Sequence, residues 1–220
     1  MGWEHPVKAE KLTLQKKEGF FMPRKARAIK QNEYYHVIIR GNNRVWLFET
    51  DSDKQCFLEV LAAYCRRYKI SIYHYCVMDN HVHLILRGEK TAESISKLMQ
   101  GVQMVFARYY KKKIKMTGAI FEGRYKSYPI RCDEYLLECG RYIERNPVRA
   151  KKTRFPEDYR WSSYRFYAYG VPNKLLSPDP VYLGLSCHEK VRRQIYRSHV
   201  KVERAYEEIV DRYFEKVAVA

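Results

Sequence analysis

Two histidines separated by a single residue lie inside an apolar run, and this pattern limits what the chain can fold into. The run reads Asp79-Asn80-His81-Val82-His83-Leu84-Ile85-Leu86. Successive side chains of a β-strand point to opposite faces, so His81 and His83 share one face while Val82 and Leu84 enter a core. We expect the histidine face to be open. Two imidazoles side by side on a rigid strand are preorganised for one divalent cation, given a third ligand.

An isolated pair of this kind also has a purely structural explanation. The two side chains can form a polar patch across strands, or they can be histidines that hydrogen-bond to each other. The rest of the chain must decide between this explanation and the metal site.

The hydrophobic pattern around the pair predicts alternating strands and helices. β-branched and aromatic runs predict strands at 34–40, 70–77 and 83–87, and a short one ending at Ile130. Helical spacing of apolar residues predicts helices at 51–68, 91–113 and 133–146, the last stopped by Pro147. The short link at 78–80 predicts an antiparallel hairpin with both strands central in the sheet.

The net charge of the chain indicates a polyanion as the partner. With 42 Lys and Arg against 25 Asp and Glu, the net charge is +17, as expected of a protein that follows a phosphate backbone. No apolar run approaches the length of a membrane span, so we predict no membrane partner. Residues 1–21 have no apolar signal region, which predicts a cytoplasmic location. Six cysteines without a C-x-x-C pair argue against a zinc ribbon.

The helix at 133–146 carries a second chemical pair. Tyr142 and Asn146 are four residues apart, so the phenol and the amide project from one helix face. A phenol, with an ordinary pKa near 10, is a poor nucleophile at neutral pH, but a divalent cation that draws charge onto a phosphate lowers the barrier it faces. The chain has 20 tyrosines. Composition alone therefore favours a packed aromatic at Tyr142.

Basic and amide side chains provide candidate contacts to DNA. A loop follows the strand at 34–40, and its side chains could grip DNA or could simply form a turn; we weigh the two equally. Basic residues also occur near the N-terminus and before the short strand that ends at Ile130. The full set of candidate DNA-binding residues is Arg24, Lys25, Arg27, Arg40, Asn42, Asn43, Arg44, Arg124 and Lys126.

Several short strings, in the same order as in a known family, carry a resemblance that spans roughly residues 22–165. The chain resembles the single-tyrosine HUH transposases of the IS200-like superfamily, and within them it is most similar to the REP-associated tyrosine transposases. The strings are Tyr35-His36-Val37 to Arg40-Gly41-Asn42, His81-Val82-His83, Glu122-Gly123-Arg124-Tyr125-Lys126-Ser127, Arg141-Tyr142-Ile143-Glu144 leading to Asn146-Pro147-Val148-Arg149-Ala150, and Trp161-Ser162-Ser163-Tyr164. An ordered set is far more specific than a histidine pair alone.

The resemblance implies a fold and a reaction. It implies an α+β, ferredoxin-like domain with an antiparallel central sheet and flanking helices. His81, His83 and Asn146 would hold Mg²⁺ or Mn²⁺, and Tyr142 would attack a scissile phosphate in single-stranded or hairpin DNA, leaving a 5′-phosphotyrosine and a free 3′-OH. The family includes both monomers and homodimers, so either state is expected.

Two positions depart from the family pattern, and the C-terminal part matches it only loosely. Phe121 stands where Trp is frequent. Arg145 stands where an apolar residue such as Leu is usual, so it is open whether Arg145 packs within the protein or contacts DNA. We expect an N-terminal extension at 1–21, a transposase domain at 22–165, and a linker with a helical C-terminal extension at 166–220. The predicted helix at 188–214 could clamp a DNA hairpin or pack on the domain through Val191, Ile195, Val202, Ile209 and Phe214.

Two other functions remain compatible with the sequence. A catalytically silent binder of structured single strands would need only the basic surface and aromatics for stacking. A metal-dependent phosphoesterase would use activated water, but a nuclease of the metallo-β-lactamase type needs an Asp after the second histidine, where this chain has Leu84. Retention of every expected catalytic residue favours the transposase.

Overall fold

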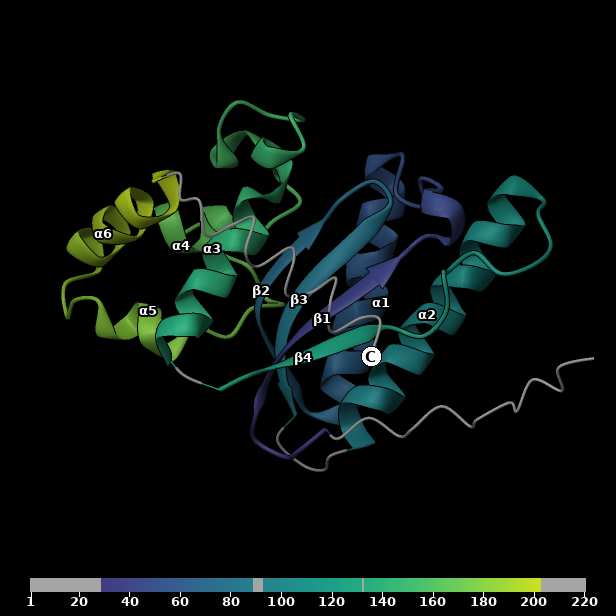
Figure 1. The fold of residues 1–220 in the computed structure, drawn as a ribbon, viewed down its shortest axis with the longest axis horizontal. Helices are drawn as coiled ribbons and strands as arrows, with labels where there is room; N and C mark the ends of the chain where they lie inside the picture. The colour runs from purple at the N-terminus through teal and green to yellow at the C-terminus, as the bar shows by residue number, and fades with distance from the viewer. Residues whose placement is uncertain (1–28, 89–92, 132, 203–220) are drawn as a thin grey trace, which may run out of the picture.

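A computed structural model describes residues 29–88, 93–131 and 133–202, in which four strands alternate with helices (Figure 1). The first part of the chain contains β1 (Tyr34–Arg40), the short 3-10 helix η1 (Asn42–Arg44), α1 (Asp51–Tyr68), β2 (Ile70–Val77), β3 (His81–Gly88), α2 (Glu93–Ile114), β4 (Lys126–Ile130) and α3 (Asp133–Arg149). After α3 come η2 (Pro156–Asp158), α4 (Tyr164–Tyr169), α5 (Pro180–Gly184) and α6 (Glu189–Lys201).

The four strands form one antiparallel sheet in the order β2-β3-β1-β4. With the succession β1-α1-β2-β3-α2-β4, this is the α+β, ferredoxin-like arrangement that the family resemblance implies. The prediction that both hairpin strands are central is wrong, because β2 lies at an edge. The residues of β2 are apolar for another reason, because the segment after α3 covers this edge of the sheet. Backbone hydrogen bonds run from Val77 N to Trp161 O and from Ser177 N to Ile72 O.

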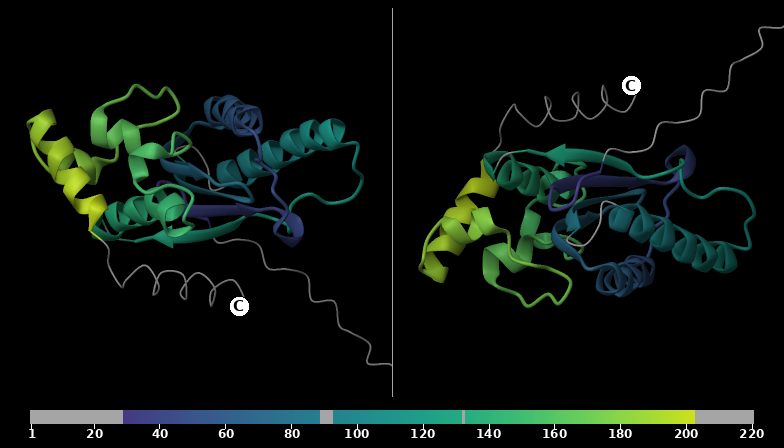
Figure 2. Two further views of the ribbon diagram at one scale, coloured as in Figure 1. Left: turned by 90° about the horizontal axis from the view of Figure 1, so that it is seen from above. Right: turned by 90° about the horizontal axis from the view of Figure 1, so that it is seen from below.

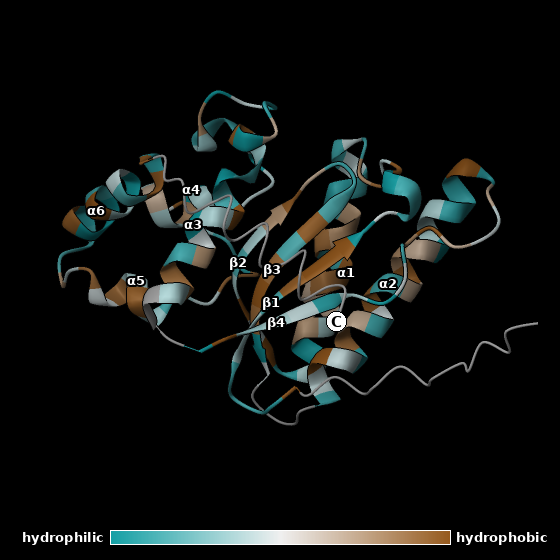
Figure 3. Ribbon diagram, viewed as in Figure 1, coloured by the Kyte–Doolittle hydropathy of each residue, from teal (hydrophilic) through white to brown (hydrophobic). Residues whose placement is uncertain are grey.

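The two helices α1 and α2 lie together on one face of the sheet (Figure 2). Val82 and Leu84 point to this side and are fully buried, as predicted. Between the helices, the ring of Phe48 packs 5.2 Å from that of Phe57 and 4.9 Å from that of Phe106. The hydropathy colouring shows the same core as brown along β1 and β3 (Figure 3). Apolar burial at this face supplies most of the driving force for folding.

The opposite face of the sheet carries four histidines and is contacted by α3. Cross-strand register puts His36 of β1 opposite Ile85, and His74 of β2 opposite the same residue, so both share the face of His81 and His83. His36 and His74 are fully buried and His83 is only 4% exposed. The expectation of an open face is therefore wrong for His83, because α3 packs over it; His81, at the end of β3, remains partly exposed.

Helix α3 continues through Pro147 and ends at Arg149, three residues beyond the predicted end. Proline removes one backbone donor and crowds the preceding turn, which usually ends a helix. Here Pro147 stands in the last turn, and the bond from Ala150 N to Asn146 O closes that turn after it. The helix therefore lacks one backbone hydrogen bond at Pro147 but continues to Arg149.

The C-terminal segment folds back onto α3 and forms a second, smaller core with it. Tyr196 and Val200 of α6 are fully buried there. The predicted contacts of α6 are wrong, since Val191, Ile195 and Val202 are 44%, 39% and 50% exposed. The described part of this helix ends at Lys201, and the predicted contacts of Ile209 and Phe214 lie outside the described residues.

Two arginines of α3 hydrogen-bond to the C-terminal end of α6. Arg145 donates from Nη1 to the carbonyl oxygens of Val200 at 3.0 Å and Lys201 at 3.3 Å. Arg141, one turn earlier, donates to the carbonyl oxygen of Val202 at 2.6 Å. The last carbonyls of a helix lack partners within the helix and lie at the negative end of its dipole, so cations are stabilising there. Arg145 therefore packs the C-terminal extension against α3.

Candidate active site

His81 and His83 lie at the start of β3, and each uses the same ring nitrogen for a protein contact. His81 Nδ1 lies 2.6 Å from the side-chain oxygen of Asn80, and His83 Nδ1 lies 2.8 Å from Nε2 of His36. The two ligand candidates are adjacent, with ring centroids 4.9 Å apart. A hydrogen bond that fixes one nitrogen leaves the other as the metal-binding atom. Both rings would therefore offer Nε2 to a cation.

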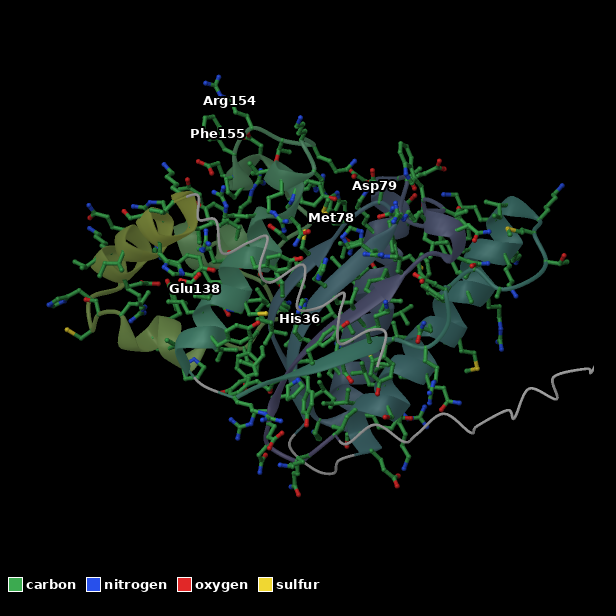
Figure 4. The ribbon with its side chains drawn as sticks, viewed as in Figure 1. His36, Met78, Asp79, Glu138, Arg154 and Phe155 are labelled. Atoms are coloured by element: carbon green, nitrogen blue, oxygen red, sulfur yellow. The ribbon has the colours of Figure 1, made fainter. Side chains whose placement is uncertain are left out.

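His36 is the residue that sequence reasoning missed. It lies within one of the strings that carried the family resemblance, but a strand sequence alone does not say which residue of another strand it meets. Only the register of β1 against β3 brings it beside His83, with the rings stacked 5.1 Å apart. If His83 donates from Nδ1, His36 accepts on Nε2, and the tautomer of His83 is set for metal binding. Figure 4 labels His36 over the middle of the sheet.

Helix α3 brings Tyr142 to the histidines. The Tyr142 ring lies 5.9 Å from that of His83 and 6.1 Å from that of His36. Asn146, one turn further, donates from its amide nitrogen to the carbonyl oxygen of Tyr142 at 3.0 Å. The guanidinium carbon of Arg149 lies 5.0 Å from the Tyr142 ring centroid. The Tyr142 ring, with Arg149 over it, therefore lies beside the two inner histidines, and Asn146 lies one turn further along α3.

Burial keeps the two inner histidines neutral. It lowers the pKa of His36 to about 3 and that of His83 well below its ordinary value; the nearby cationic groups Arg40 and Arg149 act in the same direction on His83. A neutral imidazole has the lone pair that a metal ion requires. The electrostatics therefore favour ligand chemistry over general acid chemistry at His83.

The donor set suits a hard or borderline divalent cation. Within the described residues, no group of three or more His, Cys, Asp and Glu side chains could hold a metal ion. A cation held by the predicted ligands would take the two imidazoles and the side-chain oxygen of Asn146, whose nitrogen donates to the carbonyl oxygen of Tyr142. Mixed nitrogen and oxygen ligation with open positions fits Mn²⁺ and Mg²⁺.

The predicted loop after β1 lies against this site. Arg40 is exposed and pairs with His81 across the strands, so its side chain shares the face of the histidine pair. Asn43 and Arg44 are exposed in the loop, both with positive φ (49° and 58°). Asn42 instead ties the loop to the neighbouring chain, since its side chain donates to Ala119 O at 3.4 Å. The loop therefore has a structural part and a part that faces solvent.

A glycine lets this loop approach the hairpin. A Cβ on Gly41 would lie 2.4 Å from the carbonyl oxygen of Val45, which no side chain permits. Gly41 N also donates to Asn80 O at 2.8 Å, beside His81. Only glycine lets the loop come this close to the turn before β3.

The remaining DNA-contact candidates are spread along the chain. Arg124 and Lys126 are exposed, and Lys126 pairs with Ile38 on the face that also bears His83. The predicted contacts of Arg24, Lys25 and Arg27 lie outside the described residues.

A second buried cluster lies on the other side of α3 and includes no predicted site residue. His74 contacts Glu144 through Nδ1 and Asp179 through Nε2, each at 3.0 Å. Ser163 and Tyr196 donate to the same Glu144 carboxylate at 2.6 and 2.7 Å. A Cβ on Gly140 would lie 2.6 Å from the His74 ring, so α3 packs here without a side chain. The cluster joins β2, α3 and the C-terminal segment.

Comparison with solved structures gives a clear match in fold. A REP-associated tyrosine transposase bound to a REP hairpin is 18% identical, with a TM-score of 0.56 over 72% of this chain and 93% of that one. A likeness at this identity establishes the fold alone. A putative transposase from Deinococcus radiodurans R1 (15% identity, TM-score 0.39, 62% and 98% coverage) and the tRNA(His) guanylyltransferase of Saccharomyces cerevisiae (14%, 0.36, 83% and 86%) are too distant to carry an argument.

Sequence comparison gives the family. No curated protein matches significantly. No helix among the described residues is long and apolar enough to cross a membrane. The family model described as "Transposase IS200 like" matches residues 29–146, which is more than half of the chain and includes the histidine pair, Tyr142 and Asn146. The chain therefore belongs to the family of IS200-like transposases.

Proposed function

We propose that the protein cleaves and rejoins single-stranded DNA at hairpin-forming sequences, with Tyr142 as the nucleophile and with Mg²⁺ or Mn²⁺ held by His81, His83 and Asn146. The observation that carries this proposal is the approach of the Tyr142 ring to within 5.9 Å of the His83 ring, from a different element of the same chain. Family membership makes DNA the substrate class. The hairpin preference is proposed by analogy with the REP-associated transposase.

The chemistry assigns a task to each side chain. The phenol oxygen of Tyr142 attacks phosphorus, releases its proton to solvent and forms the phosphotyrosine ester. The bond from phosphorus to the 3′ oxygen breaks, and that oxygen takes up a proton from solvent and leaves as a 3′-hydroxyl. A bound cation would supply positive charge that stabilises the phosphate as its negative charge shifts. Arg149, over the Tyr142 ring, and Arg40, beside His81, add fixed positive charge near the reacting group. Attack by the freed 3′-hydroxyl on the phosphotyrosine rejoins the strand.

Other tyrosines are less suited to the task. Tyr109 donates its hydroxyl to Asp53 and Tyr110 donates to Trp46 O, both among the elements on the other face of the sheet. Tyr135 lies seven residues before Tyr142 on α3, about 10 Å along the axis at about 1.5 Å per residue. It is therefore two turns from the amide of Asn146. The Tyr142 ring, by contrast, packs against that of His83 at 5.9 Å.

A trapping experiment tests this function with a library in place of a single defined target. A single-stranded library with randomised hairpin stems and flanks is incubated with the protein and Mn²⁺, and denaturant-stable adducts are isolated and sequenced. We expect adducts that carry DNA from the 3′ side of the cut, that need the cation, and that are lost in Tyr142→Phe. Metal-dependent cleavage without an adduct would favour the water-activating phosphoesterase. Binding without cleavage would favour the silent binder.

Monomer and homodimer both remain compatible with the proposal. All four proposed functional residues come from one chain and lie within the described segments. One chain therefore carries a complete set, whichever state it adopts. The cytoplasmic location likewise stays a prediction.

A further inference from the structure

Trp46 is a large apolar side chain at the surface beside the candidate active site. It opens the run Trp46-Leu47-Phe48, in which the second and third residues are fully buried or nearly so, at 0% and 1% exposure. Trp46 itself is 57% exposed. A single exposed aromatic is ordinary on a protein surface. Its surroundings distinguish this one.

The backbone around Trp46 is fixed to the hairpin that carries the metal-ligand pair. Before it, Gly41 N donates to Asn80 O at 2.8 Å; after it, Phe48 N donates to Asp79 O at 2.9 Å. The carbonyl oxygen of Trp46 accepts a hydrogen bond from Tyr110 at 2.9 Å. The exposed indole is therefore held on a rigid support next to the hairpin turn, whose Asp79 is labelled in Figure 4.

The side chain of Asn80 links the same loop to the catalytic face. Its oxygen lies 2.6 Å from His81 Nδ1, and its nitrogen donates to the carbonyl oxygen of Arg44 at 3.4 Å. The loop that presents Trp46 and the ring of a metal-ligand candidate thus share one amide group. A nucleotide bound at the loop would lie next to the reacting phosphate.

The charges around Trp46 suit a nucleic-acid strand. Lys152, from the segment after α3, lies with Nζ 5.9 Å from the indole ring and is held there by an ion pair with Asp79. Arg44 and Lys151 are exposed close by in sequence, and Arg40 lies across from His81. An aromatic face flanked by basic side chains is the arrangement by which proteins bind unpaired bases: the ring stacks on the base, and the cations contact the phosphates on either side.

We propose that Trp46 stacks on an unpaired DNA base adjacent to the cleaved phosphate, with the Lys152 ammonium over the other face of the indole. The assignment rests on the proposed function, since it names a contact for the same DNA strand. A stacked base would fix the strand so that one phosphate lies at Tyr142. The alternative occupant, an apolar protein surface, would use the same exposed area without needing a π face.

Binding to bases and to backbone can be separated with two probes. The probes are an oligothymidylate and an abasic oligonucleotide of the same length and charge, measured by fluorescence anisotropy in chelator. Wild type should prefer the oligothymidylate. Trp46→Ala should weaken oligothymidylate binding by about fivefold to a hundredfold, the range expected for stacking on one base, and should leave abasic binding unchanged. Quenching of tryptophan fluorescence by the oligothymidylate should shrink in Trp46→Phe.

Matched variants distinguish stacking from general apolar contact. Trp46→Tyr keeps a π face and should restore most of the affinity, whereas Trp46→Leu should not. Phe155 is a suitable control, because it is 46% exposed, has Arg154 5.2 Å from its ring, and lies on a loop projecting away from the hairpin (Figure 4). Phe155→Ala should have no effect. Unchanged thermal unfolding of each variant shows that the fold is retained.

Several outcomes would overturn the proposal. Trp46→Ala could lose affinity equally for both probes, or Trp46→Leu could restore the affinity in full. Phe155→Ala could lose as much affinity as Trp46→Ala, or the wild-type protein could bind both probes equally. The adduct experiment separates this proposal from the function on which it rests. If wild type forms the adduct but Trp46→Ala binds normally, only the stacking proposal fails; if the Trp46 effect appears without an adduct, the cleavage function fails.

Discussion

His74 Nδ1 donates a hydrogen bond to Glu144 Oε1 at 3.0 Å, joining the edge strand β2 to the helix that carries Tyr142. The other ring nitrogen donates to Asp179 at 3.0 Å, and none of the three side chains is exposed. Burial alone would lower the pKa of His74, but the hydrogen bonds to Asp179 and Glu144 outweigh it and raise the pKa to about 9. A buried imidazolium therefore links the C-terminal segment to α3.

This relationship predicts that stability falls as the pH rises. The pKa of His74 is higher in the folded protein than in the unfolded chain, so its contribution is complete below about pH 6.5 and is lost as the pH rises through about 9. The loss should approach about 3 kcal/mol in the free energy of unfolding. Denaturant titrations across this range provide the measurement. His74→Gln should flatten the profile, while His188→Gln, at an exposed position, should not; a sloping profile in His74→Gln would assign the effect elsewhere.

The role found for Arg145 predicts a local effect on α6. Arg145→Leu, which replaces the guanidinium with an apolar side chain, removes the donor to Val200 O and Lys201 O. We expect a loss of about 2 kcal/mol in the free energy of unfolding, as for a hydrogen bond from a charged group, and faster hydrogen exchange in α6. Arg66→Leu, at an exposed position of α1, is the control and should change stability by less than about 0.5 kcal/mol. Unaltered exchange in α6 would contradict the assignment.

The two metal-ligand candidates should respond differently to truncation. His83 is buried and bonded to His36, whereas His81 is partly exposed. Both His81→Ala and His83→Ala should abolish Mn²⁺ binding, measured by calorimetry or by the EPR signal of free Mn²⁺. Only His83→Ala should also lower the free energy of unfolding, by about 1–3 kcal/mol, because it leaves His36 without this partner. Retained Mn²⁺ affinity in either variant would contradict the metal site.

Binding of single-stranded DNA should depend steeply on salt because the net charge is +17. Arg40→Gln and Arg44→Gln should each reduce the slope of log K against log salt by about one, the effect of losing one phosphate contact. Lys97→Gln removes a charge that is exposed on α2 and paired with Glu93, and should leave the slope unchanged. Equal effects in all three variants would indicate a diffuse charge effect instead of a site.

The sequence predicts those features that depend on local periodicity. The strands β1 and β2 and the helix α1 begin and end where the pattern of apolar residues says they should. The positions of His81 and His83 on one strand face follow from the two-residue period of a strand, and the i, i+4 spacing of Tyr142 and Asn146 follows from the helix. These relationships involve only neighbours along the chain.

Features that depend on distant contacts were not predictable. His36 meets His83 only through the strand register, which no single strand encodes. The apolar composition of β2 suggested a central strand, because the sequence does not show that residues 161–177 cover an edge. In α6, the apolar residues most typical of a core, such as Val191 and Ile195, face outward, while Tyr196 reaches Glu144 of α3. Helix contacts there depend on buried polar partners that a hydrophobic pattern does not reveal.

The most direct test of the account is to identify the residue that becomes joined to DNA. Adducts trapped with wild-type protein are digested with protease and nuclease, and mass spectrometry locates the remaining nucleotide. The account predicts a nucleotide joined through its 5′-phosphate to Tyr142, no adduct in Tyr142→Phe, and Mn²⁺ affinity retained in that variant. A nucleotide mapped to Tyr135, Tyr109 or Tyr110, or an adduct that persists in Tyr142→Phe, would contradict it.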